Sequence, residues 1–139
     1  MGVPGIPDEA LGAWARAAGA RLLVLFGSEA GGGRGFASDL DLAVEFDRMP
    51  SPDRRLAIIG ELQALTDPRQ ADVVFLHRDL DPVLRFEIFR EGRVLFEAAP
   101  GLIVQERVRA FREYSDALPF RRLLRDQLSR MAREGTLVP

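Results

Sequence analysis

The sequence predicts an α/β (α+β) fold, in which helices flank a small mixed β-sheet and a helical segment forms the C-terminal part. Longer stretches with apolar residues at helical spacing alternate with short apolar runs, and we expect these runs to be strands. The runs cover residues 22–26, 39–46, 71–76 and 93–97. We therefore expect a single domain over residues 1–139, with an α/β core at 1–99 and helices at 100–139.

Capping signals place the helices between these strands. The first helix is expected to begin at Pro7 and to end at Gly19, because proline suits a first turn and glycine suits a C-cap. Ser51 and Pro52 start the next helix, which ends at Thr66. Its inward-facing residues are predicted to be Leu56, Ile59 and Leu62. A third helix is expected between Asp81 and Gly92.

The C-terminal segment is predicted to be helical, with an apolar stripe of Val104, Val108 and Phe111. Pro119 is expected to break or kink it before a final helix. The arginines of this segment either face solvent beside acidic neighbours or form a docking surface for an acidic partner protein. They are Arg107, Arg109, Arg112, Arg121, Arg122 and Arg125.

Composition excludes several function classes. The net charge of −2 gives no basic field for nucleic acid, so a polymerase role is disfavoured. The absence of cysteine excludes disulfides and zinc thiolate sites, and all 19 basic residues are arginine, which excludes lysine chemistry. No apolar run approaches the ~20 residues that span a bilayer, and the N-terminus lacks the features of a signal peptide. We expect a cytoplasmic protein.

The most informative stretch is Gly27-Ser28, followed after ten residues by Asp39-Leu40-Asp41. Strand side chains alternate between faces, so Asp39 and Asp41 point the same way, about 6.6 Å apart along the backbone. Two carboxylates that converge repel each other unless a cation lies between them. A Gly-Ser turn beside such a cation can hold phosphate oxygens through backbone N–H groups. The pattern predicts a metal–nucleoside triphosphate site, since aspartate is disfavoured in an ordinary strand.

At these residues the chain resembles the nucleotidyltransferase superfamily that includes DNA polymerase beta. Its size and layout are most similar to the minimal MNT type, often the antitoxin partner of a HEPN toxin. The resemblance rests on Gly27-Ser28, on Ser38 to Asp41, and on Asp72 in the third strand. The segment 86–96 also resembles the family's helix, glycine and strand.

The resemblance implies transfer of AMP from ATP to a hydroxyl, here a tyrosine of a HEPN toxin, in a homo- or hetero-oligomer. Asp39 and Asp41 would bridge two Mg²⁺ ions, and Asp72 would bind the ion nearer the acceptor or remove the hydroxyl proton. The implied nucleotide-binding residues are Gly27, Ser28, Arg34 and Ser38.

Two alternatives remain open. The acceptor could be a small hydroxylated molecule such as an aminoglycoside. The chain could instead be a non-catalytic antitoxin that neutralises its partner by binding. The second alternative follows from Gly31, which stands where minimal members commonly carry an arginine; Arg34 lies three residues further on.

Overall fold

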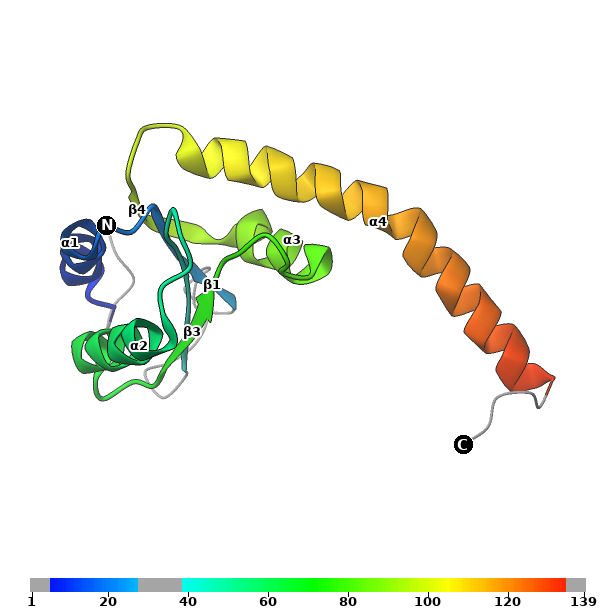
Figure 1. The fold of residues 1–139 in the computed structure, drawn as a ribbon, viewed down its shortest axis with the longest axis horizontal. Helices are drawn as coiled ribbons and strands as arrows, with labels where there is room; N and C mark the ends of the chain where they lie inside the picture. Colours follow the sequence, from blue (N-terminus) through cyan, green and yellow to red (C-terminus); the bar gives the residue numbers. More distant parts are fainter. Residues whose placement is uncertain (1–5, 28–38, 135–139) are drawn as a thin grey trace.

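The computed structural model describes residues 6–27 and 39–134 (Figure 1). Each strand lies within one residue of its expected bounds. In chain order the elements are α1 Asp8–Ala18, β1 Leu22–Phe26, β2 Leu40–Glu45, α2 Pro52–Thr66, β3 Ala71–Phe75, α3 Pro82–Glu91, β4 Arg93–Glu97 and α4 Leu102–Arg133.

The strands form one mixed sheet in the order β3-β2-β1-β4, which confirms the predicted fold class. β1 is antiparallel to β2 and to β4, whereas β2 and β3 run parallel. Leu22 to Leu25 of β1 are fully buried, because β1 has a strand on each side and helices over both faces. β1 and β2 are therefore the inner strands, and β2 carries Asp41.

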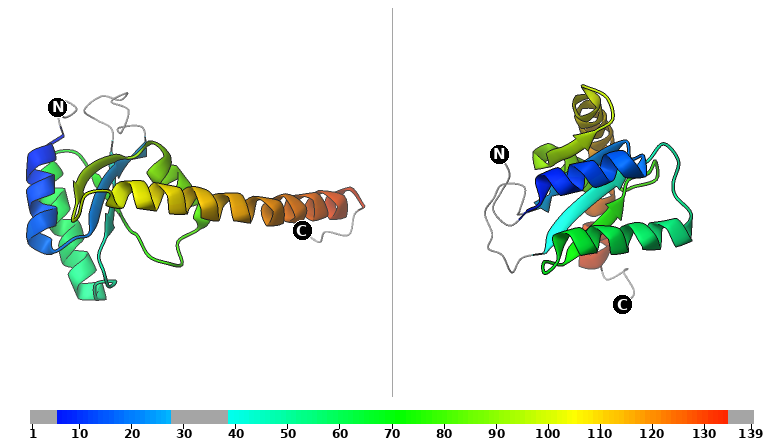
Figure 2. Two further views of the ribbon diagram at one scale, coloured as in Figure 1. Left: turned by 90° about the horizontal axis from the view of Figure 1, so that it is seen from above. Right: turned by 90° about the vertical axis from the view of Figure 1, so that its left-hand side faces the viewer.

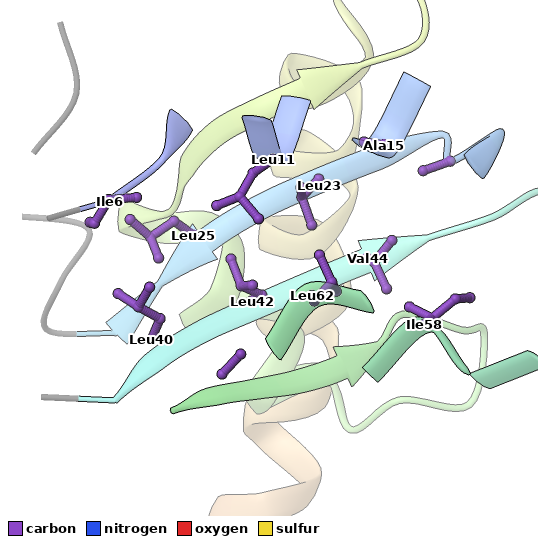
Figure 3. Packing of buried hydrophobic residues seen from close by; sticks show 12 residues of the cluster. Ile6, Leu11, Ala15, Leu23, Leu25, Leu40, Leu42, Val44, Ile58 and Leu62 are labelled. Carbon is purple, nitrogen blue, oxygen red and sulfur yellow. The ribbon is translucent and has the colours of Figure 1, made fainter. Parts of the chain in front are cut away.

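Helices cover the two faces of the sheet (Figure 2). On one face, residues of α1 and α2 such as Leu11 and Leu62 pack against Leu40 and Leu42 of β2 (Figure 3). On the other face, α3 and the start of α4 pack in a second cluster that includes Ala43. Burial of these apolar side chains is the main favourable contribution to the fold.

The predicted capping signals are confirmed. Gly19 follows α1 with a φ of 77°, a left-handed conformation that favours glycine. The Ser51 hydroxyl accepts a hydrogen bond from the Arg54 backbone N–H at 3.2 Å, with Pro52 at the start of α2. The Asp81 carboxylate caps α3 by accepting from the Val83 N–H at 3.0 Å.

The predicted inward face of α2 is wrong for two of its three residues. Leu56 is 71% exposed and Ile59 is 38% exposed. The buried residues are Ile58, Leu62 and Thr66, which recur every four positions. The helix is therefore rotated about its axis relative to the expected stripe, and only Leu62 belongs to both sets.

α4 is one helix of 32 residues that contains Pro119, so of the two expected effects the break, and with it a separate final helix, does not occur. The helix is bent near its middle, as the expected kink requires, and leaves the body of the molecule (Figure 1). Its buried residues are Ile103, Glu106 and Ala110, whereas the predicted stripe of Val104, Val108 and Phe111 is exposed. In the described ranges, none of the helices is both long and apolar enough to cross a membrane.

Candidate active site

Three aspartates gather where β2 and β3 begin. Asp41 is the second residue of β2 and lies opposite Phe26 of β1 on one side and Asp72 of β3 on the other. Adjacent strands are about 4.8 Å apart, so the Asp41 and Asp72 backbones are neighbours. Asp39 lies two residues before Asp41, directly ahead of the strand.

Asp41 and Asp72 face the side of the sheet that α3 covers. Side chains of directly paired strand residues lie on the same face. Phe26, the partner of Asp41, packs against the cluster of α3, as does Val74, two residues after Asp72. Leu40 and Leu42 pack in the opposite cluster, as strand alternation predicts.

The Asp41 carboxylate interacts with the other two carboxylates. The pKa of Asp41 is raised above its ordinary value, first by burial and then by the negative charges of Asp72 and Asp39. Desolvation and like charges both disfavour the ionised carboxylate. A cation bound among these groups would reverse the second effect.

Gly27 ends the strand that leads to the site, with a φ of 75°. A Cβ at this position would lie 2.4 Å from Asp41 Oδ2, closer than side chains approach. The glycine thus brings the turn against the carboxylate, in a conformation that L-residues rarely adopt. In the sequence, Gly27 and Asp41 are related only by the spacing of the motif; in the structure they lie against each other.

The donor set fits Mg²⁺, which prefers oxygen ligands and is commonly bound by one or two carboxylates with substrate phosphates. Asp39, Asp41 and Asp72 are the residues that could hold it. Among the described residues, acidic and histidine side chains do not form a group of three close enough to enclose an ion. A Mg²⁺ ion held by fewer carboxylates commonly takes its remaining ligands from substrate phosphates and water. Ser28, Gly31, Arg34 and Ser38 lie outside the described residues.

A feature that the sequence did not reveal lies at the other end of β2. A polar cavity of about 320 Å³ is lined there by Arg21, Glu45 and Arg85, among others. Arg85 is 2% exposed, and its Nε lies 3.7 Å from Glu113 Oε2. Arg21 joins the sheet to α4 by donating to Glu45 at 2.6 Å and to Glu106 at 2.8 Å.

This cavity is separate from the aspartates, because Glu45 lies four residues after Asp41 along β2, or roughly 13 Å. Its charges connect α4 to the sheet. His77, the only histidine, is exposed at its rim, and its Nδ1 accepts a hydrogen bond from the Asp79 N–H at 3.1 Å.

A mixed sheet that presents carboxylates from two parallel strands beside a glycine turn is the arrangement of a nucleotidyltransferase domain. The family model described as polymerase beta, nucleotidyltransferase, matches residues 15–100, more than half of the chain. The chain therefore belongs to this family. No curated protein sequence matches it.

Solved structures extend the likeness over nearly the whole chain. A toxin–antitoxin structure with AMP-PNP has a chain that is 21% identical, with a TM-score of 0.76; the match covers 89% of this chain and 99% of that one. A complex of tri-AMPylated Shewanella oneidensis HEPN toxin with MNT antitoxin gives 20% identity, a TM-score of 0.70, and coverage of 88% and 95%. At this identity the likeness establishes the fold.

Proposed function

We propose that this chain is a Mg²⁺-dependent nucleotidyltransferase that transfers AMP from ATP to a tyrosine hydroxyl of a HEPN-type toxin, and that it acts as the antitoxin. The observation that carries the proposal is the cluster of Asp39, Asp41 and Asp72 beside Gly27 in a member of this family. Similarity to one structure with AMP-PNP and another with an AMPylated HEPN toxin supports the choice of nucleotide and acceptor. Because the reaction consumes ATP, we assign it to the cytoplasm.

Each residue has a proposed role. Asp39 and Asp41 would hold two Mg²⁺ ions, and Asp72 would bind the ion nearer the acceptor. Bound Mg²⁺ neutralises the triphosphate oxygens and lowers the barrier to displacement. The backbone N–H groups of Gly27 and Ser28, with the Ser28 hydroxyl, would bind the β- and γ-phosphates. We also assign Ser38 and Arg34 to the nucleotide.

The transfer is a displacement at the α-phosphorus of ATP. The acceptor oxygen forms a bond to this phosphorus, and the bond to the oxygen that bridges to the β-phosphate breaks. Pyrophosphate leaves with that electron pair. Asp72 lies at the exposed start of β3, where it can accept the hydroxyl proton directly or pass it to water.

The proposal is tested by co-expressing the chain with the protein that the adjacent reading frame encodes, and measuring the intact mass of that protein. We expect one or more AMP increments, which disappear with Asp39→Asn or Asp41→Asn. Asp72→Asn should slow the transfer more than it weakens ATP binding. Asp53→Asn, an exposed aspartate at the start of α2, is the matched control and should leave the increments unchanged.

Two outcomes would contradict the proposal. Persistent AMP increments with Asp39→Asn and Asp41→Asn would remove these carboxylates from the reaction. A wild-type chain that binds its neighbour and leaves it unmodified would favour the non-catalytic antitoxin instead.

A further inference from the structure

The C-terminal half of α4 lies apart from the rest of the molecule. We call residues 120–133 the distal segment; at 1.5 Å per residue it is roughly 20 Å long. Both figures show it leaving the body without another element beside it (Figures 1 and 2). Its first turn is held by Arg121, whose guanidinium donates to the Asp81 carboxylate, about where α4 and α3 part.

The distal segment presents large apolar side chains to solvent. Phe120, Leu124 and Leu128 follow one another at intervals of four residues, and Leu123 lies beside them on the same face. Phe120 is 68% exposed and Leu123 is 66% exposed. We call these four residues the distal stripe. A contiguous apolar face of this kind on a helix is typical of an interaction surface.

The remaining faces of the distal segment are basic. It contains five arginines and one carboxylate, Asp126, although the whole chain has a net charge of −2. Among the described residues, four of these arginines form no ion pair: Arg122, Arg125, Arg130 and Arg133. The charge of the segment is therefore available to an acidic partner.

We propose that the distal segment is the docking surface for the protein that this chain modifies, and that the partner provides an apolar groove bordered by carboxylates. An apolar face with basic flanks is complementary to such a groove. A protein acceptor must also be held while one tyrosine reacts, and this needs a contact area larger than the aspartate cluster. The identity of the partner rests on the proposed function, whereas the docking surface rests on the helix itself.

The test measures binding without ATP, so that it does not depend on transfer. The full-length chain is titrated with the protein encoded by the adjacent reading frame, and the dissociation constant is determined by calorimetry. We expect Leu124→Asp with Leu128→Asp to weaken binding by roughly 30-fold or more, as for central interface anchors. Arg122→Glu with Arg125→Glu should also weaken binding, more strongly at low salt.

Leu56→Asp is the matched control, because Leu56 is also an exposed leucine on a helix, at 71%, but lies on α2. It should bind as the wild-type chain does. Circular dichroism of each variant checks that the helices are retained. Retained binding with loss of AMP transfer would leave the docking surface intact and reject only the proposed function.

Several results would overturn the docking proposal. One is a wild-type chain that does not bind the neighbouring protein, and another is a stripe variant that binds it as tightly as the wild type. The chain could sediment with phosphatidylcholine–phosphatidylserine vesicles only when the distal stripe is intact, while the affinity for the neighbouring protein does not depend on the stripe. That result would assign the distal segment to a membrane surface. The wild-type chain could also self-associate, and the stripe substitutions could dissociate it without changing the affinity for the neighbouring protein. That result would assign the distal segment to contact with a second copy of the chain.

Discussion

The Asp41 carboxylate is the most constrained group of the candidate site. Burial and the charges of Asp72 and Asp39 raise its pKa, and Gly27 approaches it so closely that a Cβ would lie 2.4 Å from Oδ2. The negative charge of Asp41 thus lies where burial and neighbouring carboxylates disfavour it, as is common at functional sites.

Gly27→Ala should leave the fold intact and reduce AMP transfer by about 100-fold. The added methyl group would displace the Asp41 carboxylate, and a misplacement of about 1 Å can reduce a rate by about this factor. Gly19→Ala is the matched control, because Gly19 has a similar φ of 77° and nothing within 4 Å of the added Cβ. Both variants should lose about 1 kcal/mol of stability. Equal transfer rates would show that the contact has no catalytic importance.

Asp41→Asn should raise the melting temperature of the nucleotide-free chain at pH 7 while abolishing transfer. A raised pKa means that the folded chain holds the proton more tightly than the unfolded chain, so ionisation of Asp41 lowers stability. This loss of stability is absent at pH values below 3.8, the ordinary pKa of an aspartate. It grows as the pH rises above 3.8 and is complete above the pKa of Asp41 in the folded chain. The two melting curves should therefore converge at acidic pH.

Addition of Mg²⁺ and ATP is expected to stabilise the wild-type chain, by about 2.7 kcal/mol at 100 times the dissociation constant, but not the asparagine variant. Scanning calorimetry against pH measures both effects. A variant that melts below the wild type at pH 7 would contradict the assigned electrostatics.

Polar contacts attach α4 to the rest of the molecule. Arg107 donates through Nε to the Phe89 carbonyl at 3.0 Å and through Nη2 to the Gly92 carbonyl at 2.7 Å. It thus holds α4 to the end of α3. Arg21 provides a second attachment through Glu106, which is 3% exposed.

Arg107→Ala should lower the free energy of unfolding by about 1–3 kcal/mol, because two charge-assisted hydrogen bonds are lost. Arg112→Ala on the same helix is the control and should change stability by less than about 0.5 kcal/mol, since Arg112 is exposed. Urea denaturation of the two variants measures the difference. A similar loss for both would indicate that the two hydrogen bonds of Arg107 do not determine the result.

Some features of these elements follow from local sequence, and others depend on residues far away in the chain. The strands and caps were predictable because a strand's apolar run and Ser51-Pro52 act within a few residues. The inward face of α2 was not, because Leu56, Ile58 and Ile59 offer competing stripes and only the packed sheet selects among them. Burial of Glu106 depends on Arg21, 85 positions earlier in the chain, which no local pattern shows.

The same distinction applies to the candidate site. Strand alternation predicts that Asp39 and Asp41 point the same way, and the parallel pairing of β2 with β3 brings Asp72 beside Asp41. The approach of Gly27 to Asp41 could not be predicted, since it depends on how β1 and β2 meet at their ends. The roles of all four residues remain predictions.

At the scale of the whole molecule, stability is expected to be unevenly distributed. β1 is buried between two strands and two layers of helices, whereas the distal segment of α4 is exposed along its length. The chain thus combines a rigid core that positions the aspartates with an arm that lacks such support.

Hydrogen exchange should reveal this contrast. Amides of β1 should exchange roughly a thousand-fold or more slowly than those of residues 122–133, because the former require global unfolding and the latter only local opening. Mass spectrometry of proteolytic peptides measures both regions in one experiment. Similar protection would mean that the distal segment packs against the chain or against another copy.

The pairing of Asp41 with Asp72 also limits how this chain can change in length. Removal of Val73 would invert the remainder of β3, so that either Asp72 or the apolar residues after it would turn to the wrong face. Removal of two residues would keep the alternation but shorten a strand of only five. In a deletion scan β3 should therefore tolerate almost nothing, while residues 47–50, which link β2 to α2, should accept losses and insertions freely.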